Sequence, residues 1–350
     1  VMLAALGSVD GFAGKATSIG GTFDNINDVI AGTAGTDRLT GANLPALWEL
    51  DGSDSYTASG RTLTFAAFEA LYGGSAADTF ALSGAQSYTI NAGAGNDALL
   101  MTTGASYSGV FNGQTGSDTL SYAGNTTARS VTLTGLGLVD GFTGAASGLV
   151  NDFTNIDALL GGNAQDTLTA LDAESTWTIT GANSALYTRG NSLAVIAFDI
   201  LVGSFENDTL TFATSGHATL TDLGPVDGFN VTEAGFTGEF HNINTIIGSA
   251  SAADSLKGLD ALATFNLQLA THLYTSTNTL NFSAIETLLG GSAADNFTFA
   301  DGVVFGGTLN GGDGTDSLDY SAYNSGVTVN LTTSTATGTN GISQIENITG

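Results

Sequence analysis

The sequence contains no cysteine, only two prolines and very few basic residues. The absence of cysteine excludes disulfide bonds, thiol catalysis and thiolate metal sites. Six Lys and Arg residues stand against 33 Asp and Glu residues, and the formal net charge is −27. Binding to nucleic-acid phosphates or to an anionic membrane surface depends on clustered cations, which this chain lacks. We therefore expect no nucleic acid among its partners.

Long apolar runs are also missing. The stretch 193–202 is too short for a membrane span and contains Asp199, so no membrane insertion is expected. An apolar fraction of 42% and 49 glycines nevertheless indicate a chain that buries a continuous interior and is not disordered. Because charged residues make up only 11% of the chain, Ser, Thr, Asn and Gly must cover most of the surface.

Internal repeats are the strongest signal in the sequence. One string recurs as GSVDGF at 7–12, GLVDGF at 137–142 and GPVDGF at 224–229. The repeats span approximately residues 1–130, 131–217 and 218–326, with a partial repeat at 327–350. Both ends of the sequence match interior parts of the repeat. We therefore interpret residues 1–350 as a single continuous segment of a longer repetitive protein.

A turn motif marks a shorter period inside these repeats. It consists of Gly, three or four small residues, Asp, one further residue and then Leu or Phe, as in GTAGTDRL, GGSAADTF and GGDGTDSL. Its aspartates are Asp37, Asp78, Asp97, Asp118, Asp166, Asp208, Asp254, Asp295 and Asp316. Most are separated by one or two times about 20 residues, a period typical of one coil of a solenoid.

The local pattern is that of short β-strands. Alternating, β-branched runs occur at Thr62–Phe65, Val131–Leu136, Trp177–Thr180 and Val327–Leu331, and helical periodicity is nearly absent. Sandwich domains repeat at about 100 residues, which disfavours the alternative of antiparallel sandwiches in series. The sequence therefore predicts an all-β fold, a parallel β-solenoid (β-helix) with coils of roughly 20 residues.

Some of the turns carry a calcium-binding pattern. GGDGTDSLD at 311–319 matches the calcium-binding nonapeptide of repeats-in-toxin (RTX) proteins in full, and AGAGNDALL at 92–100 and GQTGSDTLS at 113–121 match it closely. Glycine permits the left-handed backbone that points carbonyls inward, and aspartate supplies a carboxylate for a hard cation. Where the central glycine is replaced, as in GGSAADTF, the alternative is that the aspartate only caps its own turn.

In the RTX family the ion lies between equivalent turns on neighbouring coils. The resemblance therefore implies Ca²⁺ at two stacks, in which Asp78, Asp97 and Asp118 lie one coil apart, as do Asp295 and Asp316. The candidate metal-site residues are Asp78, Gly93, Gly95, Asp97, Gly113, Gly116, Asp118, Asp295, Gly311, Gly312, Asp313, Gly314 and Asp316.

Longer phrases, such as LDYSAYNSGVTVNL at 318–331 and GISQIENITG at 341–350, resemble giant secreted bacterial surface proteins built of β-strand repeats. The resemblance implies an extracellular or cell-surface location. The favoured function is a structural protein of a fibre, sheath or surface layer that is calcium-stabilised and associates with itself. The alternatives are a calcium-dependent adhesin stalk or ligand-binding module, with cell-surface polysaccharide as a partner, and a carbohydrate-active β-helix enzyme.

An enzyme is the least favoured of these functions. Polysaccharide-cleaving β-helices need acidic side chains clustered with Arg, Lys or His in a groove. The three histidines (His217, His241 and His272) do not recur in register with the repeats, and the six basic residues are scattered. Three aromatic residues do recur in register and could stack on sugars, but their place within strand-like runs favours core filling: Trp48, Trp177 and Phe265.

Overall fold

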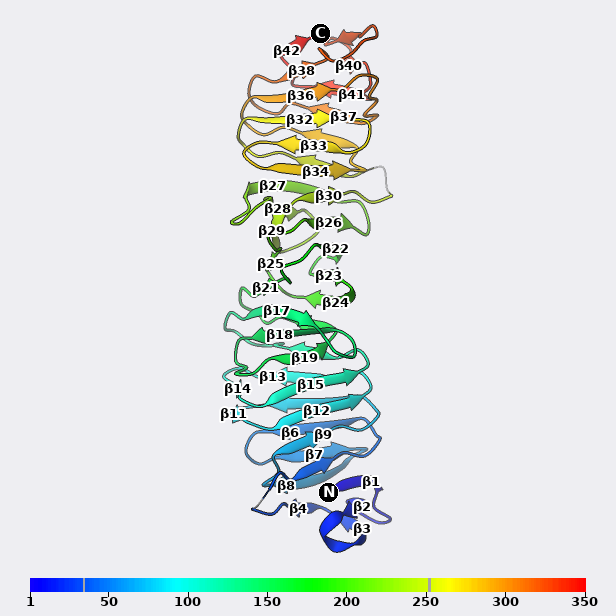
Figure 1. The fold of residues 1–350 in the computed structure, drawn as a ribbon, viewed down its shortest axis with the longest axis vertical. Coiled ribbons are helices and arrows are strands. Elements are labelled where there is room, and N and C mark those ends of the chain that lie inside the picture. Colours follow the sequence, from blue (N-terminus) through cyan, green and yellow to red (C-terminus); the bar gives the residue numbers. More distant parts are fainter. Residues whose placement is uncertain (34, 251–252) are drawn as a thin grey trace. The chain divides into compact units, whose positions relative to one another are not determined.

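A computed structural model describes residues 1–33, 35–250 and 253–350 (Figure 1). The chain forms two compact units, and we describe each by itself: unit 1 comprises Val1–Leu171 and Gly190–Phe198, and unit 2 comprises Asp172–Arg189 and Asp199–Gly350. Apart from the 3-10 turn η1 (Thr17–Ile19), every regular element in these ranges is a β-strand. The predicted all-β solenoid is confirmed. None of the described residues form a helix with the length and apolar character of a membrane span.

Unit 1 contains two sheets. By its strand pairings, sheet 1A consists in order of β3 (Gly21–Ile26), β2 (Phe12–Ala16), β1 (Met2–Leu6), β5 (Arg38–Thr40), β9 (Ala70–Tyr72), β12 (Thr89–Ala94), β15 (Val110–Thr115), β19 (Phe153–Ile156), β18 (Phe142–Ala146), β17 (Ser130–Leu136) and β21 (Thr167–Thr169). Sheet 1B consists of β4 (Asp28–Ile30), β8 (Arg61–Ala66), β7 (Ser55–Ala58), β6 (Ala46–Leu50), β10 (Asp78–Leu82), β13 (Ala98–Met101), β16 (Thr119–Ser121), β20 (Ala158–Leu160) and β24 (Asn191–Ile196). A separate short pair is formed by β11 (Ala85–Gln86) and β14 (Ser106–Tyr107).

Unit 2 repeats this arrangement. Sheet 2A consists of β25 (Ile200–Val202), β29 (Glu239–Ile243), β28 (Phe229–Glu233), β27 (His217–Leu223), β31 (Ser255–Lys257), β35 (Thr287–Leu289), β37 (Thr308–Asn310) and β41 (Gly341–Ser343). Sheet 2B consists of β23 (Ser184–Arg189), β22 (Ser175–Gly181), β26 (Asp208–Phe212), β30 (Thr245–Ile247), β34 (Thr279–Ser283), β33 (His272–Thr275), β32 (Ala263–Leu267), β36 (Asp295–Phe299), β38 (Ser317–Asp319) and β42 (Asn347–Thr349). A small hairpin joins β39 (Val329–Asn330) to β40 (Thr335–Ala336).

Three of the four strand-like runs in the sequence lie within strands of the expected length, namely β8, β17 and β22. The fourth, Val327–Leu331, contributes only the two-residue strand β39, whose partner is the antiparallel β40 and not a neighbouring coil. Its two valines, Val327 and Val329, are only half-buried, so the alternating pattern does not place them in the core.

Simple coils account for the period of about 20 residues. The chain passes from β9 to β10, then to β12 and β13, and then to β15 and β16, so that each strand pairs in parallel with its counterpart on the next coil. In unit 2, β35 and β36 are followed in the same way by β37 and β38. Equivalent residues on adjacent coils are 19 or 21 positions apart, as Asp78 and Asp97 or Asp97 and Asp118 show.

The segments between the more widely spaced aspartates of the turn motif, and the segment before Asp37, differ from this simple winding. Each contains a three-stranded antiparallel meander, for example β1–β2–β3 and β17–β18–β19 in sheet 1A and β6–β7–β8 in sheet 1B. The strand that follows the first meander in sheet 1A, β5, pairs with β1 and not with β3. In the β17–β18–β19 meander, for example, the first strand pairs with β21 of the following coil and the last strand pairs with β15 of the preceding coil. The strands of a meander therefore lie in the sheet in the reverse of their order in the sequence. This is why a coil that contains a meander is longer than a simple coil: Arg38 pairs with Ala70, which is 32 positions later (70 − 38).

The recurring VDGF string forms the first hairpin of the meanders in sheets 1A and 2A, namely β1–β2, β17–β18 and β27–β28. Its glycine adopts a left-handed conformation in all three copies, with φ of 50° at Gly11, 53° at Gly141 and 51° at Gly228. An Asp-Gly pair flanked by alternating apolar residues favours such a tight antiparallel turn. At these three positions the chain forms an antiparallel hairpin, as the local sequence favours, and not the parallel winding expected of a uniform solenoid.

The core is built from side chains that occupy equivalent positions on successive strands. In sheet 1A the register aligns Leu39, Leu71, Ile90, Phe111 and Phe153, all of which are fully buried. Alternation places every second residue inside, as the burial of β10 and β36 shows. Such columns bury apolar surface at each coil, and this burial stabilises the stack.

The recurring aromatic residues fill the core and are not exposed for sugar stacking. Trp48, Trp177 and Phe265 are all fully buried. The Trp48 ring lies 5.4 Å from the Phe80 ring in a stacked arrangement and 4.6 Å from the ring of Tyr56, its antiparallel partner. The core-filling interpretation is therefore confirmed for all three residues.

Replacing Trp48 with alanine removes the largest side chain of this column. We expect Trp48→Ala to lower the free energy of unfolding of unit 1 by about 3–5 kcal/mol, because a large buried aromatic leaves a cavity that the neighbours cannot fill. Urea unfolding followed by circular dichroism measures the loss. Leu138→Ala is the control, since Leu138 is 96% exposed. A loss for Trp48→Ala as small as that of the control would contradict the packing described here.

Candidate metal centre

Buried aspartates form columns at the corners where the chain enters sheets 1B and 2B. In unit 1 the amide of Asp78 donates to Oδ1 of Asp97 at 2.7 Å, and the amide of Asp97 donates to Oδ1 of Asp118 at 2.8 Å. In unit 2 the amide of Asp295 donates to Oδ1 of Asp316 at 2.7 Å. All five side chains are at most 1% exposed. The residues of each predicted stack therefore lie next to one another, one coil apart.

Acidic and amide side chains extend these columns, and we did not single them out from the sequence. The amide of Asp118 donates to Oδ2 of Asp157 at 3.0 Å, and the amide of Asp316 donates to Oε2 of Glu346 at 2.8 Å. The same contact joins three further pairs: Asp37 with Glu69, Asp208 with Asn244, and Asp254 with Glu286. The signal in the sequence is the recurring string that includes FTNID, FHNIN, FSAIE and ISQIE.

The middle residue of each of these strings has a left-handed backbone, and the capping side chain follows two positions later. Asn155 and Gln344, for example, have φ of 56° and 50° and precede Asp157 and Glu346. A residue in this conformation bulges the chain between two strands. The bulge places the capping side chain beside the aspartate turn of the neighbouring coil.

In one class of turn, which we call closed, the aspartate also binds an amide of its own turn. Oδ2 of Asp78 accepts the amide of Gly74 at 2.8 Å, and Oδ2 of Asp295 accepts the amide of Gly291 at 2.7 Å. The same contact closes the turns of Asp166, Asp208 and Asp254. In these turns the aspartate acts as a cap, which is the structural alternative to metal binding.

In a second class, which we call open, the residue four positions before the aspartate has a left-handed backbone. The residues are Gly93, Gln114 and Gly312, with φ of 111°, 76° and 94°. Their amides do not reach the aspartates of their own turns, which are Asp97, Asp118 and Asp316. Oδ2 of each of these three aspartates is buried and has no hydrogen-bond partner within the described ranges.

The open turns are the three that match the calcium nonapeptide. Their glycine two positions before the aspartate is also left-handed, with φ of 124° at Gly95, 138° at Gly116 and 132° at Gly314. The expected use of glycine for a left-handed backbone is therefore confirmed at these positions, and also at Gly93 and Gly312. Residue 114 shows that a glutamine can take this conformation in the same turn.

Gly113 and Gly311 are needed for a different reason, which is close approach. A Cβ at Gly113 would overlap both the carbonyl oxygen of Asn155 and Oδ2 of Asp118. A Cβ at Gly311 would likewise overlap the carbonyl oxygen of Gln344 and Oδ2 of Asp316. In both turns an unpartnered carboxylate oxygen and a carbonyl oxygen thus face the same point.

Three further residues of the predicted set, Asp313, Asp78 and Asp295, are not the unpartnered aspartates of the open turns. The side chain of Asp313 is exposed, and its amide donates to the carbonyl of Gly291, so Asp313 does not join the buried column. Asp78 and Asp295 stand at the heads of the two stacks in closed turns. Nearby amides of Ala46 and Ala263 also stabilise their charge. The predicted set therefore contains both open and closed turns.

Burial makes these carboxylates weak acids. It raises the pKa of Asp78, Asp97 and Asp118 to about 7 and that of Asp295 to about 6. The pKa of Asp316 is raised as well, first by burial and then by the neighbouring carboxylates of Glu346 and Asp313. Proximity of two acceptor oxygens in the open turns favours either a proton or a cation between them.

The donor set of the open turns fits a hard cation. Carboxylate and carbonyl oxygens are the ligands that Ca²⁺ prefers in proteins. Within the described residues no three His, Asp or Glu side chains are already grouped around one point at metal-binding distance. A cation at an open turn would therefore be held by one carboxylate together with backbone oxygens such as those of Asn155 and Gln344.

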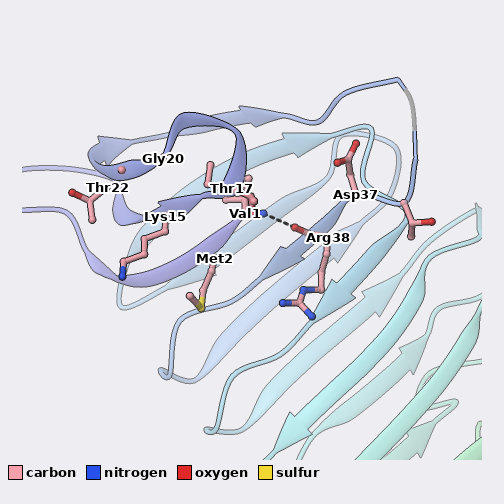
Figure 2. Close-up of a pocket in the computed structure, with 11 residues that line it drawn as sticks. Val1, Met2, Lys15, Thr17, Gly20, Thr22, Asp37 and Arg38 are labelled. Carbon is pink, nitrogen blue, oxygen red and sulfur yellow. Dashed lines mark hydrogen bonds between the residues drawn. The ribbon is translucent and has the colours of Figure 1, made fainter.

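Unit 1 also contains an open hollow of about 710 Å³ beside β1 and β2 (Figure 2). Two basic residues, Lys15 and Arg38, line it together with Asp37 and several threonines. The guanidinium of Arg38 lies 4.6 Å from the centre of the Tyr72 ring. The residues that line the hollow include no histidine and a single acidic residue, Asp37.

The histidines are not grouped with one another. Nδ1 of His217 contacts Oγ of Ser255 at 2.9 Å, and Nε2 of His241 contacts Oε2 of Glu239 at 3.1 Å. Comparisons of the chain with protein-family models, with curated proteins and with solved structures found no match. We therefore infer function from the aspartate turns and the surface of this chain.

The raised pKa values predict an unusual pH dependence. Because burial raises the pKa of Asp78, Asp97 and Asp118 to about 7 in the folded chain, these groups hold protons in metal-free buffer up to about that pH, whereas an unfolded aspartate has its ordinary pKa of 3.8. The folded state then binds more protons than the unfolded state, so stability falls as pH rises from about 4 to about 7. We expect a lower free energy of unfolding at pH 8 than at pH 5, measured with urea in excess chelator.

Asp97→Asn is the matched variant for this measurement. Asparagine keeps an Oδ1 acceptor for the amide of Asp78 and cannot ionise, so stability should decline less steeply with pH than in the parent chain. A parent chain that becomes more stable between pH 5 and pH 8 in chelator would contradict the assignment.

Proposed function

We propose that this chain is part of an extracellular structural repeat protein that calcium stabilises and that associates with itself in a fibre, sheath or surface layer. The observation that carries this proposal is the unpartnered, buried Oδ2 in each of the three turns that resemble the RTX nonapeptide. A buried carboxylate oxygen without a donor is costly, and a bound cation offsets that cost. Asp97, Asp118 and Asp316 would hold the ion, together with backbone carbonyl oxygens.

The charge of the chain supports an extracellular role for calcium. A net charge of −27 repels itself, and divalent cations reduce that repulsion. Extracellular calcium-binding modules commonly work with dissociation constants of about 10⁻⁴–10⁻³ M. A site with one carboxylate and several carbonyls suits this weak range, so calcium outside the cell would fill sites that remain empty inside it.

The construction of each unit supports a structural role. Each coil buries its side chains and satisfies its backbone against the next coil, so the units are stabilised by nearest-neighbour contacts, as in other repeat proteins. Apolar side chains at the tips of the VDGF hairpins are exposed and offer contacts for another copy: Val9, Leu138, Val139 and Val226. We expect no catalytic activity from this chain.

The hollow at Lys15 and Arg38 favours a second candidate function, a ligand-binding or adhesin module. Two cations in a strongly acidic chain would attract an anionic group, and an acidic cell-surface polysaccharide supplies many such groups. Electron microscopy separates the two candidates. Ordered fibres or sheets of the purified protein support the structural role, whereas single particles that bind an acidic polysaccharide support the second.

Calcium should raise the thermal stability of the chain, and chelation should remove the gain. A ligand that binds only the folded state stabilises it by about 2.7 kcal/mol at 100 times its dissociation constant. We expect a higher Tm in millimolar CaCl₂ than in chelator, measured by differential scanning calorimetry. Asp97→Asn should reduce the gain, because the substitution removes a ligand charge.

Asp152→Asn is the control for this experiment, since Asp152 is an exposed aspartate outside the turns. It should leave the calcium-dependent gain unchanged. Identical melting curves for the parent chain in calcium and in chelator, with no metal found by elemental analysis, would exclude calcium from its function.

A further inference from the structure

Equivalent corners in the second and third copies of the repeat differ in their balance of donors and acceptors. Each corner brings an aspartate turn next to the VDGF hairpin of the repeat that follows it. We call Asp118, Asp140 and Asp157 the second-copy corner, and Asp208, Asp227 and Asn244 the third-copy corner. The two corners share the same topology, because β16 pairs in parallel with β20 and β26 pairs in parallel with β30.

At the third-copy corner each contact pairs a donor with an acceptor. Asn244 accepts the amide of Asp208 at 3.0 Å and donates through Nδ2 to Oδ2 of Asp227 at 2.9 Å. Oδ2 of Asp208 accepts the amide and the hydroxyl of Ser204, and its Oδ1 accepts the hydroxyl of Ser175. The first copy contains the same amide contact, from Asn27 to Asp10 at 2.9 Å.

At the second-copy corner two of these donors are missing. Asp157 replaces the asparagine, so it still accepts the amide of Asp118 at 3.0 Å but has no amide group to offer Asp140. The amide of Gln114 donates to Oδ1 of Asn112 at 3.1 Å and so does not close the turn of Asp118. The corner therefore contains three carboxylates where the third copy has two and an amide.

Among the residues that the structure describes, Oδ2 of Asp118 is the unpartnered oxygen that distinguishes this corner from the third-copy corner, where Oδ2 of Asp208 accepts two donors. Asp118 is fully buried, and its Oδ2 has no hydrogen-bond partner in the described part of the chain. Within the described ranges, Oδ1 of Asp140 is also buried and unpartnered, as is Oδ1 of Asp227 at the third-copy corner, while Oδ2 of Asp140 accepts the amide of Gly116, in the turn of Asp118, at 3.3 Å. Oδ2 of Asp118 also faces the carbonyl oxygen of Asn155 across Gly113.

The three carboxylates are close enough to affect one another. The pKa of Asp157 is raised by burial and by the charge of Asp140. The pKa of Asp118 is raised by burial, then by Asp97, and then by Asp157 and Asp140. Like charges held together at a buried corner are unfavourable unless a positive charge joins them.

We propose that a hard divalent cation binds at the second-copy corner and is held by the carboxylates of Asp118, Asp140 and Asp157 and by the carbonyl oxygen of Asn155. Calcium is the probe for this site. The inference rests on the proposed calcium function and shares Asp118 with it, but Asp140 and Asp157 lie outside the nonapeptide turns. The carboxylates are not yet grouped around one point, so Asp140 and Asp157, both partly exposed, turn toward Asp118 as the ion binds.

Asp157→Asn tests this site with little disturbance. The variant recreates the Asp–Asn pair of the other two copies, and an asparagine at this position can still accept the amide of Asp118, as Asn244 does for Asp208. Calcium titration by isothermal calorimetry gives the stoichiometry, and melting curves in calcium and in chelator give the shift in Tm. Asp227→Asn, at the third-copy corner, is the matched control.

We expect Asp157→Asn to take up one calcium ion fewer than the parent chain, or to bind it at least about 10-fold more weakly. In chelator the variant should melt higher than the parent chain, because one repelling charge is gone, and calcium should raise its Tm less. Asp227→Asn should match the parent chain in stoichiometry. Asp140→Asn should reproduce the loss of calcium binding and serves as the test if Asp157→Asn does not fold.

Two other results distinguish failure of this site from failure of the wider function. If the parent chain and Asp157→Asn bind the same number of ions with the same affinity, while Asp97→Asn loses binding, the corner site is wrong and the calcium function stands. If the parent chain takes up no calcium at all, both proposals are wrong.

Discussion

The interaction on which the structure depends is the hydrogen bond between a buried aspartate and a backbone amide of the neighbouring coil. At a corner the backbone leaves one sheet for another, so its amides lose their strand partners and need acceptors. Asp97 and Asp118 supply these acceptors to the coils before them. One side chain thus sets the spacing of two coils, and the apolar columns of both sheets follow in register.

Closed and open turns differ in whether the carboxylate of the aspartate accepts an amide of its own turn. In a closed turn such as that of Asp254, an amide of the turn and an amide of the neighbouring coil both donate to the carboxylate, and the contacts stabilise the corner. In an open turn such as that of Asp316, the left-handed residue Gly312 directs its amide away and leaves one oxygen unpartnered. The cation site that we propose at these turns would make the stability of the corner depend on the ions in the surrounding solution.

The sequence predicted the parts of this structure that local chemistry decides. The period of the aspartates, the alternating strands and the burial of Trp48 all follow from patterns within a few residues. The meanders were missed although the Asp-Gly pair signals a hairpin, because the repeat suggested uniform winding. Capping by Glu346 or Asp157 was missed for a different reason: the amide that each receives lies 30 or 39 residues away, and only the left-handed bulge brings them together.

Repetition with small differences is what makes the corners informative. Asp157 and Asn244 occupy the same place in the fold and accept the equivalent amide, but only Asn244 has a side-chain NH₂ group that donates to the hairpin aspartate. A scaffold of identical coils would tolerate either residue, since the backbone contact is kept. The exchange therefore changes the charge of a corner while keeping its backbone contact, and in this way single substitutions can set the charge of each corner of a repeat protein separately.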